Sequence, residues 1–369
     1  MAARVSPADV TVVGVSGNSS AAEPSPPPPL PRTRRELRSG RLLALCHLKP
    51  PAPAPGASTS ASRSSSSCTR RVAFLFHGVG GSVDVFRHQV PLLLRLGFEV
   101  VAQDLLGHGA SGTSSNPDDF SFTALRRDAV RLFDELAAPD GDNILLGHSY
   151  GTSFVTYLCH ERSRMVTLAI QLAGGGPNAL GNEPGSVFSC CTCFFVCAGP
   201  ALRWLVRRRL FRPHGPASGS DRRLAFGVGA REFKMTMNGQ CWALGDEIYH
   251  AELRTPTLLL HGEFDRLIPL EDQQWMQQTL GGPSQLVTVP NAGHMLMLEQ
   301  PAAVNAHIAE FIASVAGAGS ATAAASVSAA ADATAELSQS RPPPPPKSMK
   351  SRRNGSVKSL PCGSQLLRY

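Results

Sequence analysis

The feature that most restricts the fold is a serine between two glycines, in the stretch GHSYG at residues 147–151. Residues 143–146 form an apolar run typical of a short buried strand, and residues 152–159 can continue as a helix. A strand that turns directly into a helix brings backbone atoms together, and Gly147 and Gly151 remove side chains that would collide there. Ser149, at the apex of such a turn, is accessible to a substrate. An ordinary loop serine fits the same stretch, so the rest of the chain must decide.

Short apolar runs alternate with helical patterns through the middle of the chain. The expected strands are residues 72–76, 98–102, 144–146, 166–172, 257–260 and 285–289, and the expected helices are 84–96, 121–138, 149–160, 270–280 and 301–315. The strands are too apolar to be half-exposed, which favours an α/β fold with a mostly parallel central sheet flanked by helices. Catalytic groups are then expected at the carboxyl ends of the strands, where Ser149 lies.

The 369 residues allow one large α/β domain with additional segments. We expect a disordered Pro/Ser-rich segment at 1–31, an edge hairpin at 32–48, a linker at 49–70, the folded domain at 71–315, and a disordered basic tail at 316–369. Residues 1–71 carry ten basic and three acidic residues, and residues 341–369 carry seven basic and none acidic. The excess positive charge therefore belongs to the ends and does not indicate a nucleic-acid-binding body. The Pro-rich and basic ends could dock protein partners.

The cysteine pattern and the hydropathy of the chain bear on its compartment. Nine cysteines have no even spacing, residues 1–20 are too polar for a signal peptide, and no apolar run reaches the length of a membrane-spanning helix. These features predict a cytoplasmic protein, and they leave open peripheral contact with intracellular membranes.

Two further apolar runs deliver an acid and a base in chain order. Residues 258–272, LLLHGEFDRLIPLED, place Asp265 after one strand, and residues 287–301 place His294 in the loop after the last strand. A serine hydroxyl needs an imidazole to take its proton, and the imidazole needs a carboxylate that fixes its tautomer. We therefore expect Ser149, Asp265 and His294 to be catalytic. Glu263 is a neighbouring alternative for the acid.

The segment FLFHGVGGS at residues 74–82 runs from a strand into a glycine-rich turn. A backbone with little side-chain bulk can aim an N–H group at an oxyanion, and we expect Val79 and Tyr150 to supply the two donors. His77, Gly78 and His148 flank these donors and are expected to contact the substrate. Taken alone, the segment would be only a tight turn.

Together, the stretches FHGVGGS, DLLGHGASG, GHSYG, GEFDRLIP and NAGH resemble the α/β-hydrolase superfamily over residues 72–315. Within it, LGFEVVAQDLLGHGAS, GGGPNAL and MNGQCWALGDEIYHAEL are similar to a branch of the abhydrolase domain-containing proteins. The resemblance implies a serine hydrolase that needs no cofactor and cleaves carboxylic esters. Neighbouring branches act on acyl lipids such as lysophospholipids, which implies a small-molecule acyl ester or lipid substrate.

Three alternatives accompany that interpretation. The stretch GHGASG at residues 107–112 matches a dinucleotide-binding pattern, but Pro117 and no helical period follow it, so we reject a nucleotide site. Some lipid-acting relatives carry an aspartate five positions after the catalytic histidine, a pattern linked to acyl transfer. Here that position is Glu299, so lysolipid acyl transfer is the weaker alternative to hydrolysis. A non-catalytic adaptor that uses its tails is the third alternative.

About 80 residues separate the expected strands at 166–172 and 257–260. This connection is far longer than an ordinary one between a strand and the next. The resemblance implies a helical cap there, at about residues 177–250. Residues 187–202 carry no charge. If this segment forms a helix, Gly199 and Pro200 are expected to interrupt it. Cysteines at 190, 191, 193 and 197 have no second pair to complete a zinc site, so we expect no metal. Either this segment contacts a membrane, with S-acylated cysteines, or it packs on the core with its thiols as small hydrophobes.

Overall fold

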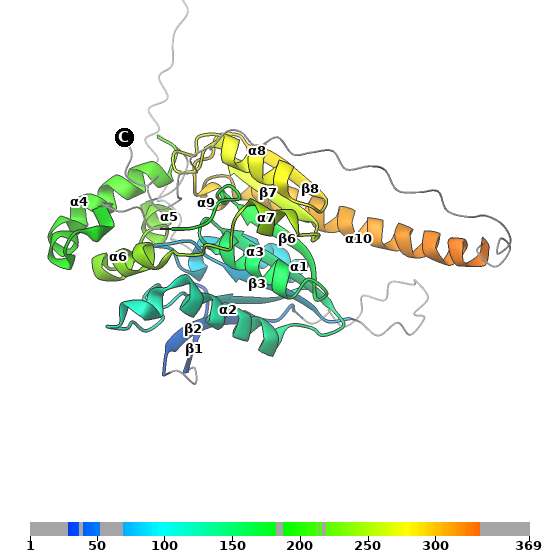
Figure 1. Ribbon diagram of the computed structural model, residues 1–369, viewed down its shortest axis with the longest axis horizontal. Coiled ribbons are helices and arrows are strands. Elements are labelled where there is room, and N and C mark those ends of the chain that lie inside the picture. The colour runs from blue at the N-terminus through cyan, green and yellow to red at the C-terminus, as the bar shows by residue number, and fades with distance from the viewer. Residues whose placement is uncertain are drawn as a thin grey trace, which may run out of the picture.

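The computed structural model describes residues 29–36, 40–51, 69–181, 187–213, 215 and 219–332. These residues form one eight-stranded sheet with the strand order β1-β2-β4-β3-β5-β6-β7-β8, flanked by helices (Figure 1). Six strands run parallel: β3 (Arg71–Phe76), β4 (Glu99–Gln103), β5 (Asp142–His148), β6 (Val166–Leu172), β7 (Thr257–Gly262) and β8 (Ser284–Val289). All six lie close to their expected bounds, and the expected fold class is confirmed.

Alternate residues of the central strands enter two separate apolar layers, which explains why those strands are apolar throughout. On one side, Leu75 and Leu146 pack with residues of α1 (Gln89–Arg95) and α10 (Pro301–Asp332). On the other side, Phe74 and Leu145 pack with residues of α2 (Phe122–Leu136) and α3 (Gly151–Glu161). Helix α8 (Leu270–Thr279) contacts β7 and β8. The helix expected at 84–96 is divided into the 3-10 turn η1 (Val83–Phe86) and α1.

The expected hairpin joins the edge of the sheet. Strand β1 (Thr33–Glu36) pairs antiparallel with β2 (Leu42–Leu48), and β2 pairs antiparallel with β4. The described part of the chain includes Leu30, which belongs to the segment expected to be disordered, and its N–H donates to Asp84 at 2.8 Å. Most of the segments expected to be disordered or linking lie outside the described residues.

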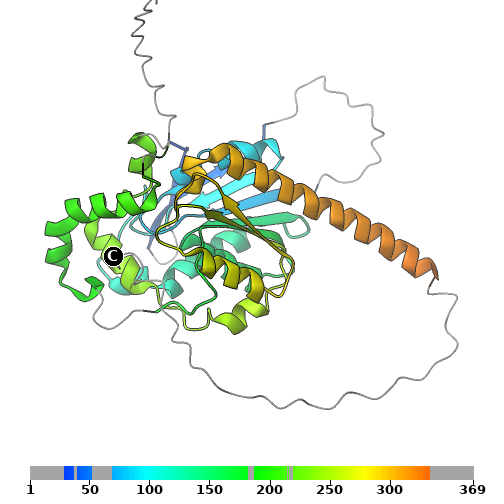
Figure 2. The same cartoon turned by 90° about the horizontal axis from the view of Figure 1, so that it is seen from above.

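The last helix is longer than the sequence predicts. Helix α10 runs to Asp332, past the domain end expected at residue 315, and Figures 1 and 2 show its last turns extending away from the sheet. Residues 316–332 are rich in alanine, which has the highest helix propensity of all residues. Helix propensity is therefore a sufficient reason for the additional turns.

A helical cap lies between β6 and β7, as expected, at one end of the molecule in Figure 1. It comprises the 3-10 turn η3 (Val187–Ser189) and four helices: α4 (Thr192–Leu210), α5 (Gly219–Leu224), α6 (Ala230–Gly239) and α7 (Glu247–Ala251). The expected interruption of α4 is wrong, because the helix passes through Gly199 and Pro200. A proline removes one N–H donor and can bend a helix without ending it. Among the described residues, no helix is long and apolar enough to cross a membrane.

Candidate active site

Ser149 lies at a sharp turn from β5 into α3. Its φ of 52° is in the left-handed region that residues with a side chain rarely adopt. A Cβ on Gly147 would lie 2.8 Å from the carbonyl of Gly151, and a Cβ on Gly151 would lie 2.0 Å from the oxygen of Phe76. The turn is held by the N–H of Ser149, which donates to Leu172 at 2.9 Å. The two glycines are therefore required by the close approach of the backbone around the serine.

Asp265 and His294 form a buried pair at the carboxyl ends of β7 and β8. His294 Nδ1 lies 2.8 Å from Asp265 Oδ2, and the two side chains are 2% and 0% exposed. Because a carboxylate accepts this bond, Nδ1 carries the proton and Nε2 is left as the basic nitrogen. The other carboxylate oxygen of Asp265 accepts from the N–H groups of Leu267 at 2.8 Å and Ile268 at 3.0 Å.

The environment of Asp265 favours its charged form. Burial by itself raises the pKa of this carboxyl, but the nearby His294 charge and the hydrogen bonds from His294, Ile268 and Leu267 lower it by more. The net result is a pKa below the ordinary value of 3.8. Glu263, the alternative acid, is exposed and accepts the N–H of Asn291 at 2.9 Å. The structure therefore brings Asp265, and not Glu263, to His294.

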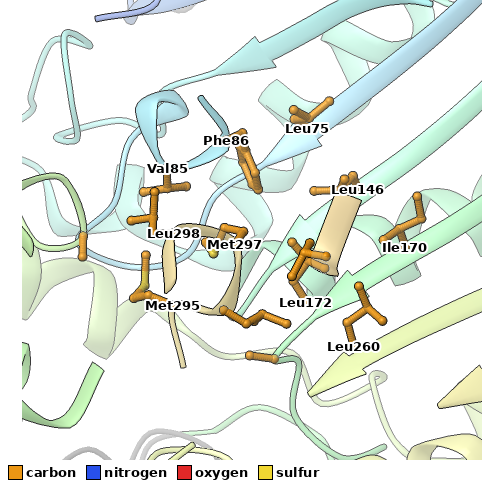
Figure 3. Close-up of a cluster of buried hydrophobic side chains, with 14 of the residues drawn as sticks. Leu75, Val85, Phe86, Leu146, Ile170, Leu172, Leu260, Met295, Met297 and Leu298 are labelled. Atoms are coloured by element: carbon orange, nitrogen blue, oxygen red, sulfur yellow. The ribbon is translucent and has the colours of Figure 1, made fainter. Parts of the chain in front are cut away.

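The loop that carries His294 is fixed by apolar packing and by His148. Met295, Met297 and Leu298 pack against Leu172 and Leu260 of the sheet (Figure 3). His148 Nε2 lies 3.0 Å from the carbonyl oxygen of His294, so this nitrogen must be the donor. Burial and the nearby His294 lower the pKa of His148 to about 3, which keeps the ring neutral near pH 7. His148 lines the cavity and also holds the backbone of His294.

Glu299 joins this loop to the cap. Its carboxylate accepts the N–H of Gly293 at 2.7 Å and the N–H of Arg212 at 2.9 Å, where Arg212 follows the end of α4. The N–H of Met295 also donates to Leu210 in α4 at 3.1 Å. Glu299 is 3% exposed and does not line the cavity at Ser149. Glu299, five positions after His294, therefore attaches the cap to the His294 loop. The sequence pattern did not indicate this role.

The two expected oxyanion donors lie beside the serine. Val79 and Tyr150 line the same cavity as Ser149, and within the described chain neither backbone N–H donates a hydrogen bond. Gly78 also lines this cavity, and a Cβ there would lie 2.8 Å from the Cβ of Ser149. Only glycine allows the turn to approach the serine this closely.

His77 does not line the cavity at Ser149, where a residue that contacts substrate is expected to lie. Its Nδ1–H donates to Gly78 at 2.7 Å, its Nε2 accepts the N–H of Leu105 at 3.0 Å, and the residue is fully buried outside the cavity lining. Burial lowers its pKa, in keeping with a neutral ring. The expectation that His77 contacts substrate is therefore corrected to a structural role: it holds the glycine-rich turn against the end of β4.

Ser149 and His294 open onto one cavity of about 100 Å³. Its wall is largely apolar and is built by the glycine-rich turn, the start of α3, the segment after β6, the cap, the segment after β7 and the His294 loop. The cap contributes Val206, Leu210, Phe226, Phe233, Met237 and Trp242, and the segment after β7 contributes Leu267, Ile268 and Met276. No lysine or arginine is among the described residues that line it. The sequence predicts the cap but not these lining residues, because they come together only in the folded chain.

The cap cysteines and arginines lie apart from this cavity. Cys190, Cys191, Cys193 and Cys197 are exposed, and no group of three or more metal-ligating side chains is found in the described part of the chain. Arg207 is turned inward, with Nη2 donating to the carbonyl of Phe226 at 2.9 Å. The cavity thus offers apolar surface beside Ser149 and His294, with no lysine or arginine among its described lining residues.

Comparison with known proteins extends these observations. A model of the alpha/beta hydrolase family matches residues 73–307. The chain is 40% identical over 246 residues to the protein ABHD8 of Homo sapiens, a match that covers 65% of this chain and 55% of that protein. The chain therefore spans about half the length of the curated relatives it matches.

Two solved structures share the fold. An esterase from Exiguobacterium antarcticum has a TM-score of 0.57 at 16% identity, over 76% of this chain and 98% of its own. A mutant of the epoxide hydrolase from Solanum tuberosum has a TM-score of 0.61 at 18% identity, over 77% of this chain and all of its own. At this identity, the likeness concerns the fold alone.

Proposed function

The chain belongs to the alpha/beta hydrolase family, and within that family we propose that it is a serine hydrolase that cleaves carboxylic esters. The observation that carries this proposal is the buried pair of His294 and Asp265, with Nδ1 and Oδ2 2.8 Å apart, opening onto the same cavity as Ser149. A scaffold or adaptor has no need of a strained serine, an imidazole and a buried carboxylate in one place.

The proposed reaction begins when His294 Nε2 removes the proton of Ser149 Oγ, which attacks the ester carbonyl carbon. The carbonyl oxygen becomes an oxyanion and accepts from the N–H groups of Val79 and Tyr150. Asp265 stabilises the imidazolium that forms. The tetrahedral intermediate then collapses, the C–O bond to the alcohol breaks, and His294 returns the proton to the leaving alcohol.

An acyl group on Ser149 then remains in the cavity. A water molecule gives its proton to His294 and attacks the acyl carbonyl, and the carboxylic acid leaves as Ser149 regains its proton. Another alcohol could resolve the acyl-enzyme in the same manner. Glu299, the residue that approximates the acyl-transfer pattern, is engaged with Gly293 and Arg212 and does not line the cavity. Hydrolysis is therefore the better supported outcome.

The cavity wall supports an apolar acyl group as the part of the substrate that enters. Phe226, Met237 and Trp242 offer apolar surface, and no cation among the described lining residues would bind an anionic headgroup. We propose acyl-lipid esters as the finer class, with the acyl chain in the cavity and the headgroup outside it.

The experiment compares wild type with Ser149→Ala in labelling by a fluorophosphonate probe and in hydrolysis of p-nitrophenyl butyrate. Ser153→Ala is the matched control, since Ser153 lines the same cavity one helical turn away. We expect Ser149→Ala to lose labelling and turnover, His294→Ala to be nearly as damaging, and Ser153→Ala to retain both. Turnover retained by purified, folded Ser149→Ala would refute the proposal.

A further inference from the structure

We propose that the outer face of α4 docks on an anionic membrane surface. This outer face consists of Cys193, Phe194, Val196, Cys197, Arg203, Trp204 and Arg208, which are all exposed. The opposite face of the helix carries Phe195, Gly199, Val206 and Leu210, which are buried in the protein. The inference concerns binding and stands apart from the chemistry at Ser149.

The outer face gathers apolar area that the protein itself leaves uncovered. Phe194 is 45% exposed, Val196 59% and Trp204 59%. Six large hydrophobic side chains are exposed in the described chain, and three of them lie on this one helix. Single exposed apolar residues are ordinary on soluble proteins, but a group of them on one helix face marks a surface that binds something.

The charge of α4 selects the kind of partner. The helix contains four arginines and no acidic residue. Arg203 and Arg208 are exposed beside the apolar side chains, and the guanidinium of Arg208 lies 4.6 Å from the ring centroid of Trp204. Arginines beside an exposed indole and phenylalanine match the boundary of an anionic leaflet, where the cations contact phosphates and the rings lie at the headgroup level.

The same helix connects this surface to the cavity. Val206 and Leu210, on the buried face of α4, line the cavity that contains Ser149. A membrane on the outer face would therefore lie about one helix diameter, roughly 10 Å, from the cavity wall. Because its opposite face is buried in the protein along its length, α4 would lie in the plane of the interface.

The test measures binding of the full chain to phosphatidylcholine vesicles with and without phosphatidylserine, by sedimentation. Two variants probe the surface: Arg203→Gln with Arg208→Gln, and Phe194→Ser with Val196→Ser. Arg95→Gln with Arg127→Gln removes the same charge from exposed positions on α1 and α2 and is the matched control. Arg207 is left unchanged, because it holds Phe226 in the cap.

We expect wild type to prefer the anionic vesicles. The α4 arginine pair should weaken that binding about 30-fold, from about fivefold for each lost charge near the leaflet, and the apolar pair about tenfold. The control pair should weaken it by much less. Vesicles with brominated acyl chains should quench Trp204, the exposed tryptophan, and Trp204→Phe should remove most of that quenching.

Several outcomes would overturn the proposal: equal binding to neutral vesicles, an α4 arginine pair that binds like the control pair, or unquenched Trp204. Binding that depends on neither α4 variant would assign the vesicle contact to the basic ends of the chain. Ser149→Ala should bind vesicles like wild type, so that loss of docking and loss of catalysis remain distinguishable. Turnover of p-nitrophenyl butyrate should be unchanged in both α4 variants.

Discussion

The left-handed backbone at Ser149 has an energetic cost that the surrounding contacts must offset. A residue with a side chain in this region costs of the order of 1–3 kcal/mol, and such strain persists only where neighbours fix the conformation. Here the N–H of Ser149 is held by Leu172, and the Thr152 hydroxyl donates to the Ser149 carbonyl at 2.7 Å. The strain presents the serine hydroxyl to the cavity at the amino end of α3.

At the residue scale, the acid can be assigned by matched neutral substitutions. Asp265→Asn keeps the shape of the side chain but presents an amide to His294 Nδ1, which favours the tautomer with its proton on Nε2. We expect kcat for p-nitrophenyl butyrate to fall by roughly 10⁴-fold, as in serine proteases with this change. Glu263→Gln should change kcat by less than about twofold, because Glu263 contacts the backbone of Asn291. Equal losses in the two variants, or the reverse order, would reassign the acid.

Sequence patterns predict that Ser149, Asp265 and His294 lie near one another, because each follows its own strand and parallel strands end at one edge of the sheet. They could not separate His77 from His148, although both stand beside a glycine of the site. The His77 ring is buried under the glycine-rich turn, and the His148 ring lines the cavity. That difference depends on the packing of β4 and of the His294 loop, which no local pattern encodes.

At the element scale, the edge hairpin is held by arginines whose partners are far away in the sequence. Arg32 contacts Asp84 at 2.5 Å and Asp104 at 2.9 Å, and Arg41 contacts Asp128 in α2 at 2.7 Å. The sequence predicted a hairpin from weak alternation and a glycine. It could not predict these ion pairs, because they form only when the hairpin lies against the folded sheet.

The burial of Asp128, the partner of Arg41, predicts a pH dependence of stability. Burial raises the pKa of Asp128 from its ordinary 3.8 to about 6, although Arg41 opposes the shift. The folded state therefore favours the protonated acid, and the stability that this contributes is present below pH 3.8 and lost as the pH rises through 6. We expect the free energy of unfolding of wild type, relative to Asp128→Asn, to fall by up to about 3 kcal/mol between pH 3.5 and 7. Urea unfolding at several pH values measures this, and parallel curves for the two proteins would contradict it.

At the scale of the whole molecule, the parts differ in how they are stabilised. The sheet and its flanking helices bury two apolar layers, the cap covers the cavity, and the charge excess belongs to the two ends. The cap was predictable as a long connection between strands, whereas the continuity of α4 through Pro200 was not. The low helix propensity of Pro200 is a local effect. The packing of Phe195, Val206 and Leu210 on the core outweighs it.

Helix α10 shows where the packed part of the chain ends. Val304, Ile308, Phe311 and Ile312 lie on one face and are buried against the sheet, whereas the last turns of the helix extend away from it (Figure 2). An alanine-rich helix that does not pack on a core is marginal in water and adds little to the stability of a domain. We therefore expect a chain that ends at Val315 to unfold within about 0.5 kcal/mol of the full chain, and to keep its ester turnover. Ile308→Ala, which leaves a cavity in the core, should cost about 3 kcal/mol in either chain length. Urea denaturation of the four proteins makes the comparison, and a truncation that costs as much as Ile308→Ala would mean that residues beyond 315 pack on the domain.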